Sequence, residues 1–144
     1  MITAEYIAKL VTQALSEDVA NGDITAELIG ADVQASGRIV TREDGILCGT
    51  TFALEVFQQI DPSCHMEWAA QDGDSIAADS LVCTLSGPAR ALLTGERTAL
   101  NFLQLLSGTA TTAGQYAARV AHTKVKLLDT RKTCLLYTSP SPRD

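Results

Sequence analysis

The sequence is poor in aromatic residues, proline and histidine, and it has no long uninterrupted apolar stretch. Aromatic residues make up 5% of the 144 residues, and there are 4 prolines and 2 histidines. A membrane-spanning helix needs about 18 or more consecutive apolar residues, so the sequence predicts none. The hydrophobic content of 46% and the few prolines indicate a globular domain and argue against disorder.

An excess of positive charge is also missing. The chain has 11 basic and 17 acidic residues, which gives a formal net charge of −6. Because nucleic-acid phosphates are neutralised by a basic surface, we expect no general nucleic-acid binding. Residues 1–5 have neither the basic segment nor the apolar core of a signal peptide. The sequence therefore favours a cytoplasmic protein that does not bind a membrane.

The four cysteines, Cys48, Cys64, Cys83 and Cys134, form no C-x-x-C pair, which argues against a zinc site. We expect reduced thiols that are buried as small hydrophobic side chains. His65 follows Cys64, but neighbours in a strand point to opposite faces and cannot converge on one atom. The carboxylates around Asn21-Gly22-Asp23 could suggest a metal site, yet turn hydrogen bonds are the more common role of such residues.

Apolar spacing predicts an alternation of helices and strands along the chain. Thr3 is expected to cap a first helix that ends near Asp18, and Thr50 or Thr51 a second that ends before Asp61-Pro62. Leu81, Cys83 and Leu85 are expected on the inner face of their strand. The predicted helices cover 3–18, 50–60, 88–106 and 109–121, and the predicted strands cover 32–42, 64–68, 80–86 and 124–128.

The helix predicted from Pro88 to about Leu106 organises the rest of the chain. Proline suits the first helical position, and Ser107-Gly108 is a typical end signal. Its apolar residues recur at the spacing of one buried stripe, at Leu92, Leu93, Ala99, Leu100, Leu103 and Leu106. Arg90 and Arg97 are seven residues apart and share another face. The simplest interpretation of Arg97 is a solvated surface arginine.

A second basic cluster, Asp129-Thr130-Arg131-Lys132-Thr133, follows the strand predicted at 124–128. Ligands of α/β folds bind at the carboxyl ends of strands. Together with Arg97, this cluster suggests a site for a ligand with several negative charges.

An ordered series of short motifs resembles the quinolinate phosphoribosyltransferase family, the carboxylating nicotinate-nucleotide pyrophosphorylases. Each motif is weak alone, but the series is specific, above all ERTALNFLQLLSG followed by DTRKT. The other matching segments are 17–18, 22–25, 45–49, 87–90 and 107–111. The resemblance reaches Thr133 and covers about the first half of the family's length.

The resemblance implies an α+β fold in which an amino-terminal α/β sandwich domain with long helices precedes a (β/α) barrel. Residues 1–108 would form the sandwich with its organising helix, and residues 109–133 the start of the barrel, with its first strand at 124–128. Residues 134–144 resemble a peptide encoded by a common sequencing adaptor, so we expect them to be an artefact and the natural protein to continue past Thr133.

The resemblance also implies a reaction in which quinolinate and phosphoribosyl pyrophosphate give nicotinate mononucleotide, pyrophosphate and carbon dioxide, with Mg²⁺. Arg131 would hold one quinolinate carboxylate, Lys132 would face the donor's phosphates, and Thr130 would add a contact beside them. In a homodimer, Arg97 would reach the neighbouring subunit's site. The role of Arg90 stays open between a structural contact and a substrate contact. The magnesium ligands are expected beyond Thr133, and the chain alone is expected to be inactive.

Two other interpretations remain. A related phosphoribosyltransferase-like protein, of the ModD type associated with molybdate uptake genes, would share the amino-terminal architecture. A biotinyl- or lipoyl-type carrier would match the turn-strand pattern of residues 72–85. Such carriers need a lysine on an exposed hairpin, and no lysine occurs between Lys9 and Lys124.

Overall fold

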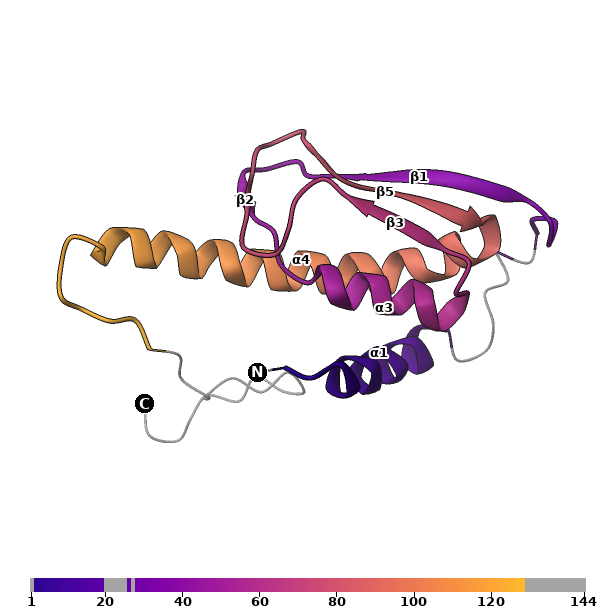
Figure 1. Cartoon of the computed structure of the whole chain (residues 1–144), viewed down its shortest axis with the longest axis horizontal. Coiled ribbons are helices and arrows are strands. Elements are labelled where there is room, and N and C mark those ends of the chain that lie inside the picture. Colours follow the sequence, from indigo (N-terminus) through magenta and orange to yellow (C-terminus); the bar gives the residue numbers. More distant parts are fainter. Residues whose placement is uncertain (1, 20–25, 27, 129–144) are drawn as a thin grey trace.

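The computed structural model of the chain describes residues 2–19, 26 and 28–128. Helices and strands alternate along the chain, and a single long helix closes the series (Figure 1). The elements are α1 (Ala4–Asp18), β1 (Gln34–Val40), β2 (Gly45–Ile46), α3 (Thr50–Ile60), β3 (His65–Trp68), β4 (Ser75–Ile76), β5 (Leu81–Pro88) and α4 (Ala89–Val120). The expected α+β class is confirmed.

Three layers make up the domain. The antiparallel sheet has the order β1-β5-β3, and β2 and β4 form a small second pair. Helices α3 and α4 pack side by side beneath the sheet, and α1 packs on them from the other side (Figure 1). The sheet and the helices thus form a sandwich, as expected.

The core lies between the sheet and the helix pair and continues between that pair and α1. Phe57, Val11, Val56 and Cys83 are its largest fully buried side chains, and the rings of Phe52 and Phe102 stack with centroids 5.0 Å apart. Gly95 lets α4 approach α3 closely, because a Cβ there would lie 2.7 Å from the Phe57 ring. The first half of α4 is therefore fitted tightly against α3.

Several local predictions are confirmed. The Thr3 hydroxyl accepts a hydrogen bond from the Tyr6 amide at 3.2 Å, and α1 ends at Asp18. In β3, which lies within the strand predicted at 64–68, Met66 is buried and Trp68 half-buried, while His65 and Glu67 are exposed, with Nε2 of His65 3.6 Å from Oε1 of Glu67. These elements are specified by neighbouring residues, so their sequence patterns suffice.

The predicted helix break at Ser107-Gly108 is wrong, because α4 is one helix of 32 residues. The Ser107 hydroxyl accepts from the Cys48 amide at 3.0 Å and donates to the Cys48 carbonyl at 3.1 Å. The Thr111 hydroxyl accepts from the Ile46 amide at 2.8 Å. A glycine inside a helix costs only about 1 kcal/mol, and these contacts with β2 and the segment after it hold the helix straight through Gly108.

The strand predicted at 124–128 is also absent from the described chain. Val125, Leu127 and Leu128 are 61%, 52% and 82% exposed. A strand requires a partner for its backbone hydrogen bonds, and no described strand pairs with this segment. Its apolar composition alone is not enough to form one.

Smaller corrections concern caps and strand faces. Gly49, at φ 102°, caps α3 in place of the expected threonines, and Pro88 ends β5 and caps α4 instead of starting its first turn. In β5 Val82 is buried, whereas Leu81 is 40% exposed. The strand predicted at 32–42 is shorter in the structure, and Val33, which precedes β1, is 46% exposed.

Candidate functional site

Arg97 lies in the first third of α4 and directs its side chain away from the core. The side chain is 76% exposed, and its Nη1 lies 3.0 Å from Oδ1 of Asp18, the last residue of α1. The other oxygen of Asp18 accepts a hydrogen bond from the buried Thr98 hydroxyl at 2.8 Å. The guanidinium is thus anchored at one nitrogen by a carboxylate that is itself held in place.

A hollow of about 440 Å³ surrounds this pair, between the end of α1 and the middle of α4. Glu17, Asp18, Asn101 and Phe102 line it beside Arg97. Its mixture of one cation, two carboxylates and an amide can bind a small polar group, with Arg97 as the donor for an anion.

Arg90 has a different partner. Its Nε donates a hydrogen bond at 2.7 Å to the carbonyl of Ile29, in the segment before β1. This hydrogen bond ties the segment to the start of α4, and the choice between a structural contact and a substrate contact for Arg90 stays open. Arg90 and Arg97 share the helix but contact different parts of the chain.

The second predicted cluster lies outside the described residues. The structure places none of Asp129, Thr130, Arg131 and Lys132, so their convergence with Arg97 stays a prediction. Within the described ranges, no group of three histidine, cysteine, aspartate or glutamate side chains could hold a metal ion. Because the magnesium ligands are expected beyond Thr133, the described residues do not test that expectation.

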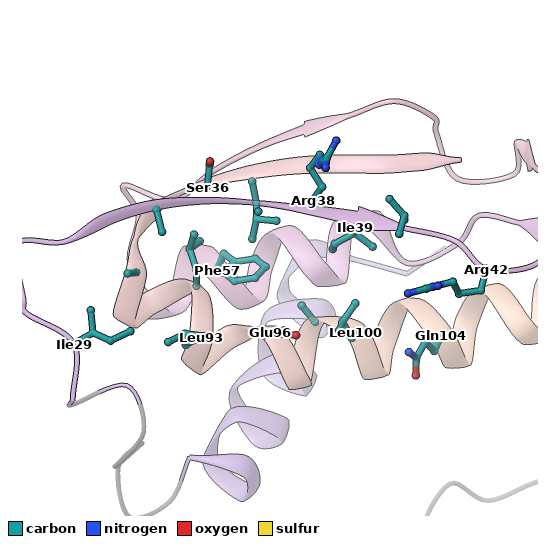
Figure 2. A pocket seen from close by; sticks show the side chains of 17 residues that line it. Ile29, Ser36, Arg38, Ile39, Arg42, Phe57, Leu93, Glu96, Leu100 and Gln104 are labelled. Carbon is teal, nitrogen blue, oxygen red and sulfur yellow. The ribbon is translucent and has the colours of Figure 1, made fainter. Parts of the chain in front are cut away.

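A larger hollow of about 620 Å³ separates β1 from α4 (Figure 2). Ile39, Phe57 and Leu100 point into it, and Arg42 lies near Gln104 at one end. Its lining is mostly apolar and contains no histidine, cysteine or paired carboxylates. Arg38 and Arg42 are among its lining residues, so cations border both hollows, and the smaller one is distinguished by the anchored guanidinium of Arg97.

The described cysteines are poorly suited to nucleophilic chemistry. Burial raises the pKa of Cys83 to about 11. Burial, and then the Asp61 carboxylate, raises the pKa of Cys64, and burial, and then the Asp72 carboxylate, raises the pKa of Cys48. A thiol with a raised pKa is protonated at neutral pH and unreactive. Cys64 and Cys83 are free and buried, as predicted.

Sequence reasoning missed Asp18 as the partner of Arg97. Asp18 was interpreted only as the end of a helix. It lies 79 positions from Arg97, and no spacing rule connects residues so far apart in the sequence. The one available signal was the place of Glu17-Asp18 in the motif series.

None of the described helices has the length and apolar character needed to cross a bilayer.

Comparison with known proteins decides the family. Residues 23–107, more than half of the chain, match the domain described as "Quinolinate phosphoribosyl transferase, N-terminal domain". The chain belongs to the quinolinate phosphoribosyltransferase family. The match spans β1 to β5 and the α4 segment that carries Arg97, and α1 with Asp18 lies before it.

Relatives within the quinolinate phosphoribosyltransferase family agree. The chain is 38% identical over 121 residues to a probable carboxylating nicotinate-nucleotide pyrophosphorylase of Synechocystis, with 84% of this chain and 41% of that protein covered. A Bacillus subtilis protein of the same name is 34% identical over 127 residues, with 88% and 44% covered.

A solved structure shows the same fold. The nicotinate-nucleotide pyrophosphorylase of Francisella tularensis superposes on this chain with a TM-score of 0.88 at 42% identity. The superposed region covers 92% of this chain and 48% of the Francisella chain. The chain thus spans less than half the length of these relatives. The predicted family resemblance is confirmed.

Proposed function

We propose that the chain forms the amino-terminal part of a phosphoribosyltransferase that converts quinolinate and phosphoribosyl pyrophosphate to nicotinate mononucleotide, pyrophosphate and carbon dioxide. The observation that carries the proposal is the exposed, anchored guanidinium of Arg97 in a chain of this family. Quinolinate is a planar dianion, and arginine matches a carboxylate with two parallel hydrogen bonds. The enzyme would act in the cytoplasm in pyridine-nucleotide biosynthesis.

The other predicted site residues would bind the remaining negative groups of the two substrates. Arg131 would hold a second carboxylate, and Lys132 with Thr130 would face the phosphates of the donor. Departure of pyrophosphate leaves positive charge on the ribose carbon and negative charge on oxygen, which fixed cations stabilise. Magnesium, when bound, would add to that stabilisation. Loss of carbon dioxide next to a cationic ring nitrogen needs no protein nucleophile, in keeping with the protonated cysteines.

A hybrid enzyme tests this function directly. Residues 1–133 of this chain are joined to the part of the Bacillus subtilis relative that follows its matched region, and nicotinate mononucleotide formation is measured. We expect product, and a quinolinate KM at least about tenfold higher for Arg97→Ala, since a charge-assisted hydrogen bond contributes about 1.5–3 kcal/mol. Arg119→Ala, at the far end of α4, is the matched control. A folded hybrid without product, or an unchanged KM, would refute the proposal.

The homodimer, with Arg97 serving the neighbouring site, has its own test. Arg97→Ala and Arg131→Ala hybrids are mixed, unfolded and refolded together. If Arg97 acts across the interface, each mixed dimer contains one site with both arginines, and activity returns to about a quarter of normal from random pairing. If Arg97 acts within its own subunit, every site stays defective and no activity returns.

A further inference from the structure

The carboxylate of Asp18 has two partners on adjacent residues of α4. Oδ2 accepts from the Thr98 hydroxyl at 2.8 Å, and Oδ1 accepts from Nη1 of Arg97 at 3.0 Å. The Asp18 side chain is 21% exposed, and Thr98 is 3% exposed. The carboxylate is therefore held by a buried hydroxyl from below and presents one oxygen to the guanidinium above.

Arg97 is held at one end only. Among the described residues its single polar partner is Asp18, and the side chain is 76% exposed. A guanidinium has a side edge formed by Nε and Nη2, and this edge can take both oxygens of a second carboxylate. With Nη1 engaged by Asp18, that edge stays open to a ligand.

We infer that Asp18 is a positioning residue, which fixes the guanidinium of Arg97 so that its Nε–Nη2 edge faces a planar carboxylate of the substrate. The inference rests on the proposed function for the identity of that substrate. Thr98 has a supporting role, because its hydroxyl holds the carboxylate in the orientation that reaches Arg97. Pre-organisation of this kind lowers the entropy that a long side chain loses on binding.

The negative charge of Asp18, considered without its hydrogen bonds, would weaken the binding of an anionic substrate. Asp18 has the same sign as the substrate, so removing its charge would strengthen anion binding if long-range electrostatics dominated. Water screens that repulsion at an exposed site. Positioning therefore predicts weaker substrate binding on loss of the carboxylate, and electrostatics predicts tighter binding, so the direction of the change separates them.

A purely structural role for Asp18 also makes a distinct prediction. In that case the hydrogen bond between Asp18 and Thr98 would serve to tie α1 to α4. Removing the Asp18 carboxylate would then lower the stability of the domain equally with and without Arg97. A positioning residue acts through Arg97, so its effect on substrate binding disappears once Arg97 is removed.

The first experiment needs only the full 144-residue chain. Side-chain ¹⁵N NMR measures rotation about the Nε–Cζ bond of Arg97, which a hydrogen bond at Nη1 slows. We expect several-fold faster rotation in Asp18→Asn, a smaller increase in Thr98→Val, and no change in Glu67→Gln, which removes an exposed carboxylate of the His65 pair. Equal rotation in the wild type and Asp18→Asn would overturn the inference.

The second experiment is a double-mutant cycle in the hybrid enzyme. Asp18→Asn should raise the quinolinate KM several-fold with little change in kcat, and should have no further effect in Arg97→Ala. An equal effect in both backgrounds, or a lower KM, would overturn the positioning role. A hybrid that makes no product with all native residues would refute the proposed function, while the NMR result would still decide whether Asp18 holds Arg97.

Discussion

The two halves of α4 have the same backbone but opposite surroundings. All of its buried residues lie between Ala89 and Leu103, where the sheet and α3 cover it. Beyond Leu103 no residue of the helix is buried, and Leu105 and Tyr116 are 57% and 56% exposed. Local hydrogen bonds thus set how far a helix runs, whereas packing decides which part of it stabilises the domain.

The largest expected change in the free energy of unfolding comes from truncating Phe57, the side chain against which the first half of α4 packs. Phe57 is 1% exposed and lies against Gly95 of α4. Phe57→Ala should lower the free energy of unfolding of the chain by about 3–5 kcal/mol in a urea titration, because it leaves a cavity that the tight core cannot close. Leu105→Ala, on the exposed side, should change it by less than about 0.5 kcal/mol. Similar losses for both variants would erase the contrast between the halves.

Gly95→Ala should destabilise the packed half although alanine favours helices. The new Cβ would lie 2.7 and 2.9 Å from two Phe57 ring atoms and 3.0 Å from Ile60. Since the ring is buried, we expect a net loss of about 1–3 kcal/mol in the free energy of unfolding. A gain in stability would show that α3 and α4 can move apart without penalty.

Ser107→Ala tests the boundary between the halves. It removes both hydrogen bonds to the backbone of Cys48, which are partly buried. The expected loss is about 1–2 kcal/mol in the same titration. Thr109→Ala is the matched control, because its hydroxyl bonds only to the carbonyl of Leu105 in its own helix. Equal effects of the two variants would mean that the Cys48 contact does not fix the helix.

Gly108→Ala should have the smallest effect and the opposite sign. A Cβ at this position meets no atom within 4 Å, and the residue is already helical. The helix preference of alanine should therefore add about 0.5–1 kcal/mol to the free energy of unfolding. A loss of stability would indicate that the chain needs to bend at Gly108, as the sequence signal predicted.

Elements determined by near neighbours could be predicted, and those determined by distant contacts could not. The bounds of α3 followed from its apolar spacing and Asp61-Pro62. Its amino-terminal cap did not, since the Asp72 carboxylate accepts from the amides of Gly49 and Thr50 across more than twenty positions. For the same reason Arg97 could be singled out from the sequence, while its partner Asp18 could not.

The unbroken course of α4 fixes a direction as well as a length. Arg97 and Val120 lie on one rod, about 35 Å apart at a rise of 1.5 Å per residue. Each added residue turns such a rod by about 100°. One residue inserted after Tyr116 would leave the core untouched, yet it would re-aim everything that follows Val120 by more than a quarter turn relative to the Arg97 guanidinium.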